Sequence, residues 1–167
     1  MNKIKKWILW SFVLLWMGNI LSFSSKPAEI SKKQSGFFVA FAQKMVVGLE
    51  KKLNISPLNT DKLDHYIRKT AHVFNYFVLT LLLIIAYFSI KKSKNYAFVH
   101  SSLFAFLFSI FDELFQTFVP GRSGMFRDVL IDQIGTIMAL LLIYLVLKRK
   151  LTTNATVDVV CHEQQRA

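Results

Sequence analysis

Charged and amide side chains gather in one stretch of the chain, residues 108–135, which lies between long apolar runs. The side chains in this stretch that could take part in binding or catalysis are Asp112, Glu113, Gln116, Arg122, Arg127, Asp128 and Asp132. A charged side chain inside a bilayer costs about 2.5–3.5 kcal/mol on insertion scales, so such residues face a bundle interior or a water-filled cavity and find partners there. We therefore expect this stretch to hold the functional site and the remaining segments to position it.

A second polar group precedes an earlier apolar run. Arg68, His72 and Tyr76 follow one another at intervals of four residues, so they share one face of a predicted helix. Asp112 and Gln116 are likewise one turn apart on a later helix. Polar residues from three predicted helices thus converge at one depth, which is stronger evidence for a site than any single residue.

The first hypothesis for this cluster is a binding site for a membrane lipid or a lipid-linked envelope ligand. Arg68, Lys69 and Arg122 would bind its phosphate or carboxylate, because guanidinium groups pair with such anions through two parallel hydrogen bonds. The acidic side chains would neutralise and orient those cations. Tyr76, Gln116 and Asp132 complete the predicted ligand-binding set, which is Arg68, Lys69, Tyr76, Gln116, Arg122 and Asp132.

The second hypothesis is a membrane enzyme that acts on a lipid-linked or cell-wall substrate. His72 would be its general base with Glu113 or Asp112 as partner, Asp128 is a further catalytic candidate, and Arg122 would stabilise a developing phosphate charge. The carboxylates and His72 could instead hold a divalent ion. Because no H-x-x-x-H or H-E-x-x-H motif and no nucleophile elbow is present, we predict neither a metal nor a cofactor. Whether the protein is an enzyme stays open.

The third hypothesis is structural. The acids and bases would pair with one another, fix the register of the helices and leave function to a partner protein, since buried ion pairs often do no more than this. Conservative substitutions such as Glu113→Gln or Arg122→Lys separate the hypotheses. They abolish a working site at unchanged protein level, whereas they lower the protein level if the pairs are structural.

The elements that must position these residues are membrane-spanning helices. The chain has 167 residues, of which 53% are hydrophobic and 16 are Phe, and its long uncharged runs fit a small all-α membrane protein. We predict one domain, residues 1–150, built as a bundle of four transmembrane helices, and a mobile polar cytoplasmic tail at 151–167. The predicted spans cover residues 7–23, 71–90, 96–119 and 129–147. An amphipathic helix at residues 36–53 is expected on the membrane surface between the first and second spans.

Small residues and turn formers refine this picture. Pro120 and Gly121 stop the third span, and Asp128 lies where the fourth helix begins, so its carboxylate suits the positive end of the helix dipole. Gly135 and Ala139 are four residues apart and would let a neighbouring helix approach closely.

The distribution of charge sets the predicted topology. The formal net charge is +11, and the Lys and Arg residues flank the apolar runs instead of forming a basic patch with interleaved aromatic residues, so no nucleic-acid partner is expected. Basic clusters at 3–6, 91–94 and 148–150 fall on one side, which is the cytoplasmic side by the positive-inside rule. A multi-pass protein of the cell membrane follows, with cytoplasmic termini and the polar cluster toward the outer face. The single Cys161 offers no internal disulfide.

Three motifs resemble the VanZ-like family of bacterial membrane proteins. They are RKTAH with a following Tyr at 68–76, DELFQTFVPGRSG at 112–124 and RDVLIDQIG at 127–135. The stretch FSSKPAEISKKQSG at 23–36 is similar to the Gram-positive branch, and the resemblance covers nearly the whole chain except the tail. By the family pattern the functional set is Arg68, Lys69, His72, Tyr76, Asp112, Glu113, Gln116, Arg122, Asp128 and Asp132.

The resemblance implies a role in the cell envelope. The family is associated with low-level resistance to glycopeptides such as teicoplanin, and the resemblance settles no reaction. Asn75 stands where the family usually has Glu, so a chemistry that needs that carboxylate as base or ligand would be impaired here. If the position only forms hydrogen bonds, Asn serves equally well. A homo-oligomer is left open.

Overall fold

The computed structural model describes residues 3–27, 30, 60–90 and 93–164, with side chains described at 3–27, 30, 66–90 and 93–149. All regular structure in this part of the chain is helical, which confirms the all-α fold. The helices are α1 (Lys3–Ser24), α3 (Thr60–Ser89), α4 (Lys94–Thr117) and α5 (Phe126–Gln164). The amphipathic helix predicted at 36–53 lies outside the described residues.

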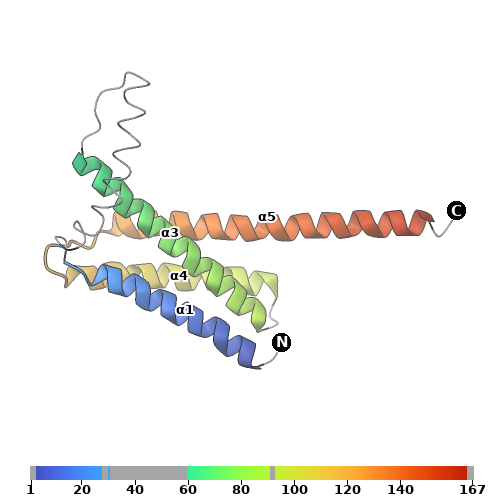
Figure 1. Cartoon of the computed structure of the whole chain (residues 1–167), viewed down its shortest axis with the longest axis horizontal. Coiled ribbons are helices and arrows are strands. Elements are labelled where there is room, and N and C mark those ends of the chain that lie inside the picture. Colours follow the sequence, from blue (N-terminus) through green and yellow to red (C-terminus); the bar gives the residue numbers. More distant parts are fainter. Residues whose placement is uncertain (1–2, 28–29, 31–59, 91–92, 165–167) are drawn as a thin grey trace, which may run out of the picture.

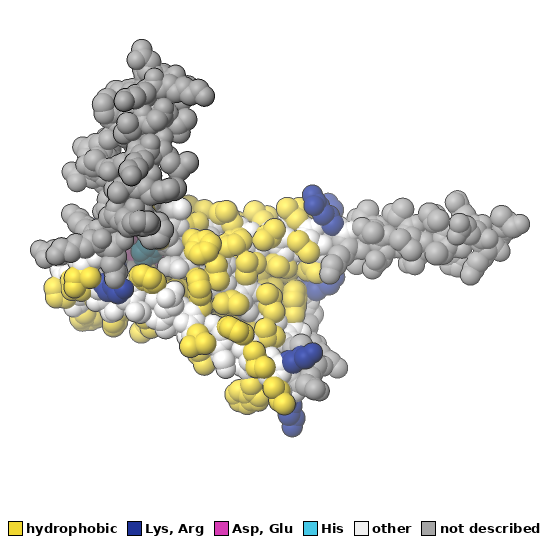
Figure 2. Space-filling model, in the orientation of Figure 1, with side chains coloured by type: hydrophobic (Ala, Val, Ile, Leu, Met, Phe, Trp, Pro, Cys, Tyr) yellow, Lys and Arg dark blue, Asp and Glu magenta, His cyan; other side chains and the backbone are white. Residues whose placement is uncertain are grey.

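Each of the four helices contains a segment that is long and apolar enough to cross a membrane. These segments are Lys3–Ser24, Tyr66–Ser89, Lys94–Thr117 and Phe126–Arg149, in agreement with the four predicted spans. Large apolar side chains point outward from all of them and cover the visible face of the bundle, while Lys and Arg lie near its two ends (Figure 2). An apolar exterior with charge at the ends suits a bilayer, whose core can solvate neither charged side chains nor open backbone groups.

Helix α3 is the central element of the bundle. It packs against α1, α4 and α5, and its contact with α5 is the most extensive (Figure 1). Close approach there depends on Gly135 of α5, because a Cβ at this position would lie 2.1 Å from the carbonyl oxygen of Val73 and 2.8 Å from the amide nitrogen of Phe77. Ala139 is fully buried on the same face. The predicted small-residue contact is therefore confirmed, and it joins α5 to α3.

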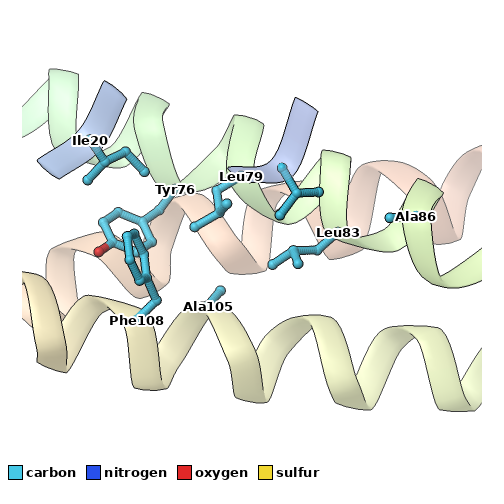
Figure 3. Close-up of a cluster of buried hydrophobic side chains, with 8 residues drawn as sticks. Ile20, Tyr76, Leu79, Leu83, Ala86, Ala105 and Phe108 are labelled. Atoms are coloured by element: carbon cyan, nitrogen blue, oxygen red, sulfur yellow. The ribbon is translucent and has the colours of Figure 1, made fainter. Parts of the chain in front are cut away.

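The apolar core occupies the middle of the bundle (Figure 3). Leu79, Leu83 and Ala86 of α3 lie against Ala105 and Phe108 of α4. Val13 and Ile20 of α1 close the cluster from the remaining side. These buried side chains keep the helices in fixed register, so the polar residues one or two turns away are held at defined positions.

The connection between α4 and α5 is a tight turn that places one cationic side chain. The amide of Arg122 donates a hydrogen bond to the carbonyl oxygen of Val119 at 3.1 Å, across Pro120 and Gly121. Gly121 has a φ of 74°, as the third residue of a type II turn requires, and Pro favours the position before it. Gly124 then lies directly on α4, because a Cβ there would be 2.2 Å from the Glu113 carbonyl oxygen. The turn therefore folds back over the end of α4.

The C-terminal segment is helical beyond the last predicted span. We predicted a mobile tail at 151–167, but α5 continues without interruption to Gln164 (Figure 1). Residues 151–164 contain neither Pro nor Gly, so nothing in the sequence stops a helix that the preceding span has already nucleated. The part of the predicted tail up to Gln164 is therefore helical, while its mobility, its cytoplasmic location and the domain boundary after residue 150 stay predictions.

Candidate functional site

Polar side chains from all four helices and the α4–α5 turn meet at one end of the bundle. We define the polar end as Ser24, Arg68, Lys69, His72, Tyr76, Asp112, Glu113, Gln116, Arg122, Asp128 and Asp132. Asp112 and Asp132 have no exposed surface, and Glu113 and Gln116 are each 5% exposed. The structure thus brings together every site residue that the sequence predicted, although their roles stay predictions.

Gln116 is the hub of a hydrogen-bond network at the end of α4. Its side-chain nitrogen lies 3.3 Å from Asp112 Oδ2, 3.2 Å from Glu113 Oε1 and 3.4 Å from Ser24 Oγ, so two N–H groups serve three acceptors. Its side-chain oxygen accepts a hydrogen bond from Arg122 Nη1 at 3.2 Å. One amide therefore ties α1, α4 and the turn together.

Arg122 links the turn to the end of α1. Its Nη2 donates to the carbonyl oxygen of Phe23 at 3.1 Å, which is one of the carbonyls that the end of a helix leaves without an intrahelical donor. Burial lowers the pKa of the Arg122 guanidinium and the charge of Arg68 acts in the same direction, whereas Asp112 and Glu113 oppose both. An arginine starts from so high a pKa that it keeps its charge. Arg122 is therefore a permanent cation at the polar end.

Two acid–base pairs join α3 to α5. Lys69 forms an ion pair with Asp128, which lies in the first turn of α5 as predicted. One turn farther along both helices, His72 Nδ1 faces Asp132 Oδ1 at 3.2 Å. The side chain of Asp132 is fully buried and that of His72 is 22% exposed. The histidine therefore borders the interior on one side and accessible space on the other.

Several buried polar atoms of the polar end are not saturated. Within the residues that the structure describes, Asp112 Oδ1, Asp132 Oδ2 and the Tyr76 hydroxyl have no hydrogen-bond partner. Glu113, by contrast, accepts from Gln116 and, at 3.0 Å, from the backbone N–H of Met125. A buried polar atom without a partner costs about 1–3 kcal/mol, so these three atoms are the candidates for contact with a bound group.

A cavity of about 800 Å³ opens beside these residues. This volume lies in the usual range for small-molecule sites. Its charged and polar lining includes Arg68, Lys69, His72, Gln116, Arg122 and Asp128. Its apolar lining includes Trp16, Ile20, Phe23, Phe74 and Met125. The cavity therefore offers cationic groups and apolar surface to the same occupant.

Sequence reasoning missed three contributors to the polar end. Ser24 is buried at 3% exposure beside Gln116, and the backbone N–H of Met125 reaches Glu113. Trp16 lines the cavity, and its indole N–H donates to the carbonyl oxygen of Asn75 at 3.0 Å. Ser24 carried a weak signal, since it ends the first apolar run, but the backbone donor carried none. Asn75, the departure from the family pattern, also lines the cavity.

Comparison with known proteins adds a family to this geometry. The VanZ/LLP1 family model matches residues 9–147. The chain is also similar to the uncharacterized membrane protein YwnJ of Bacillus subtilis (strain 168), with 38% identity over 72 residues. That alignment covers 43% of this chain and 45% of YwnJ, so it spans less than half of either protein. No solved structure matches the chain.

Proposed function

This chain belongs to the VanZ/LLP1 family, and from that premise we propose that its polar end binds an anionic membrane lipid or lipid-linked envelope ligand. The observation that carries the proposal is the composition of the cavity. Arg68, Lys69 and Arg122 lie on its wall together with large apolar side chains, in a space of about 800 Å³. A phosphate or carboxylate would meet the cations while an attached hydrocarbon chain meets the apolar part.

The donor inventory of Arg122 supports this assignment. A guanidinium has five N–H donors, and the bonds to Gln116 and to Phe23 use one on Nη1 and one on Nη2. Its Nε has no partner within the described part of the chain. The same fork can therefore stay anchored to the protein while its other donors turn to an anion.

The cellular role follows from the side of the membrane that the polar end faces. We place it toward the outer face, because the basic clusters at 3–6, 91–94 and 148–150 favour a cytoplasmic location for the opposite end. An occupied or altered lipid headgroup at the outer face would reduce the access of teicoplanin-type glycopeptides to their surface target. The protein would then contribute to low-level glycopeptide resistance.

A second candidate function is a membrane enzyme that acts on a lipid-linked or cell-wall substrate. The observation in its favour is the His72–Asp132 pair, in which a buried carboxylate orients an imidazole beside the cavity. This arrangement is typical of a general base held in one tautomer. Arg122 would stabilise negative charge that develops on a phosphate.

Teicoplanin susceptibility of a sensitive Gram-positive host tests the proposed role. The host would express the wild-type protein, Arg122→Lys, Glu113→Gln, His72→Ala or the control Lys94→Gln, with membrane levels matched by blot. Lys94 is an exposed cation at the start of α4, at the opposite end of the bundle. The expected result is protection by the wild type and Lys94→Gln, and loss of protection by the polar-end variants. Equal protection by all five proteins, or by none of them, would contradict the proposal.

A further inference from the structure

We propose that His72, Asp112 and Glu113 form a binding site for a divalent first-row transition-metal ion such as Mn²⁺ or Zn²⁺. One ligand atom from each of these side chains lies within 4.8 Å of the other two. Two of the residues are consecutive on α4 and the third comes from α3, so packing of these two helices assembles the set. No sequence motif indicates this site, because residues 72 and 112 lie far apart in the sequence and are brought together only by the fold.

The separation of the ligand atoms suits one ion. Carboxylate and imidazole ligands lie about 2.0–2.2 Å from such metals, so two ligands on opposite sides of an ion are separated by about 4.2 Å. The three ligand atoms, all within 4.8 Å of one another, are therefore close to the spacing that one bound ion requires. Three protein ligands leave at least one coordination position for water or a bound anion, as in catalytic zinc sites.

The partner of His72 is the second observation that points to an ion. Metal-binding histidines almost always donate their other ring N–H to a carboxylate or carbonyl, which fixes the tautomer and the direction of the ring. His72 Nδ1 faces the fully buried Asp132 Oδ1 at 3.2 Å. With Nδ1 held in this way, Nε2 is the nitrogen that remains for the ion.

Unsaturated oxygens supply a third observation. Asp112 has no exposed surface, and its Oδ1 has no hydrogen-bond partner among the described residues. The same is true of the Tyr76 hydroxyl. Figure 3 shows this hydroxyl pointing away from Leu83 and Ala86. A bound ion would satisfy the carboxylate oxygen, and a ligand on the ion would accept a hydrogen bond from the tyrosine.

The donor set selects the class of metal. One imidazole with two carboxylates matches Mn²⁺, Fe²⁺ or Zn²⁺, whereas Mg²⁺ and Ca²⁺ prefer oxygen ligands alone. An ion would also offset the repulsion between two adjacent buried carboxylates on α4. The site needs none of Arg68, Lys69 or Arg122, so it stands independently of the proposed anion binding.

Metal titration of the purified full-length chain tests the inference. The protein in detergent would be stripped with a chelator and titrated with Mn²⁺ alone, with binding followed by electron paramagnetic resonance and competed with Zn²⁺. His72→Asn, Asp112→Asn and Glu113→Gln each remove one ligand. Asp128→Asn is the matched control. Asp128 lies at the same end of the bundle and pairs with Lys69, but it is not a member of the triad.

Selective loss is the expected result. Each ligand variant should weaken Mn²⁺ binding by more than about 100-fold, and Asp132→Asn by about 10–100-fold, as lost outer partners of metal ligands do. The control should weaken binding far less than any ligand variant, because it removes a nearby charge and no ligand atom. A wild-type protein that shows no saturable binding, or equal affinity in the ligand variants, overturns the inference. Equal loss in Asp128→Asn does so too, since it indicates a general charge effect.

A spectroscopic measurement keeps the test decisive if a ligand variant fails to fold. Electron spin echo modulation of Mn²⁺ bound to the wild-type protein should show coupling to one imidazole nitrogen. Bound Mn²⁺ without nitrogen coupling would overturn the assignment of His72. Neither measurement uses a lipid, so failure of the metal site and failure of anion binding are distinguishable.

Discussion

The two ends of the bundle are held together in different ways. Opposite the polar end lies an aromatic end, made of Trp10, Tyr87, Tyr96 and His100, where the ring of Tyr87 lies 5.3 Å from that of Trp10, 5.9 Å from that of Tyr96 and 5.8 Å from that of His100. These contacts join α1, α3 and α4 without burying a carboxylate. The same three helices meet at the polar end around Asp112, Glu113 and Gln116, all of which are buried.

The two ends differ in how their side chains affect the stability of the bundle. An aromatic pair stabilises the fold by about 0.5–1.5 kcal/mol beyond the contribution of its buried area. Buried carboxylates with unsaturated oxygens lower stability unless something completes them. A bundle that required only cohesion could close both ends with rings. The composition of the polar end is therefore in keeping with the proposed binding site.

The largest expected effect falls on the close contact between α5 and α3. Gly135→Ala places a methyl group 2.1 Å from the Val73 carbonyl oxygen, so α5 must move away from α3. We expect a loss of about 3 kcal/mol, at the upper end of ordinary overpacking. Gly18→Ala is the control, because a Cβ there meets nothing within 4 Å. Thermal unfolding in detergent measures both, and similar melting temperatures would contradict the predicted packing.

Substitution of Gln116 tests whether the stability of the polar end depends on one side-chain amide. Gln116→Leu deprives Asp112, Glu113 and Arg122 of a partner at once, and we expect a loss of about 2 kcal/mol. Gln133→Leu is a matched control, since the side-chain nitrogen of Gln133 donates one hydrogen bond, to Ser109 Oγ at 3.2 Å. Denaturant titration in detergent should rank the hub variant as the less stable. The reverse order would show that the network contributes little to the free energy of unfolding.

Arg122→Lys separates charge from geometry at the polar end. Lysine keeps the cation but cannot reach Gln116 and the Phe23 carbonyl oxygen through one rigid fork. We expect a loss of stability of about 1 kcal/mol, one hydrogen bond's net contribution, together with a loss of about tenfold in affinity for an anionic lipid. Melting curves and lipid titrations of the same preparation measure the two effects. Unchanged lipid affinity would show that a point charge suffices.

The smallest effect belongs to the aromatic end. A double-mutant cycle with Trp10→Leu and Tyr87→Leu should give a coupling energy of about 1 kcal/mol, as edge-to-face pairs do. Neither substitution should alter lipid affinity, because both lie at the opposite end of the helices. Unfolding of the four proteins in the cycle gives the coupling. Weaker lipid binding in these variants would contradict the assignment of lipid binding to the polar end alone.

The sequence predicted the four spans and the convergence of their polar residues, because hydropathy and helical spacing are local properties. Gly135 was identifiable for the same reason, since a small residue on a polar face of a span indicates close packing. Ser24 and the Met125 amide were not, because their contacts depend on how α1 and the turn cross the end of α4. The spatial grouping of His72 with Asp112 and Glu113 also depends on that packing. The continuation of α5 to Gln164 was not predicted, because the polar composition of residues 151–167 was interpreted only as a tail outside the bundle.

The most direct test of the central claim is lipid binding by native mass spectrometry in chelator-containing buffer. Wild type, Arg122→Gln and Lys94→Gln would each be offered phosphatidylglycerol or a polyprenyl phosphate against phosphatidylcholine. The account predicts preferential retention of the anionic lipids, with loss of about tenfold or more in Arg122→Gln and none in Lys94→Gln, because Arg122 lines the cavity and Lys94 does not. Equal retention of anionic and zwitterionic lipids by the wild type, or equal loss in both variants, would contradict it.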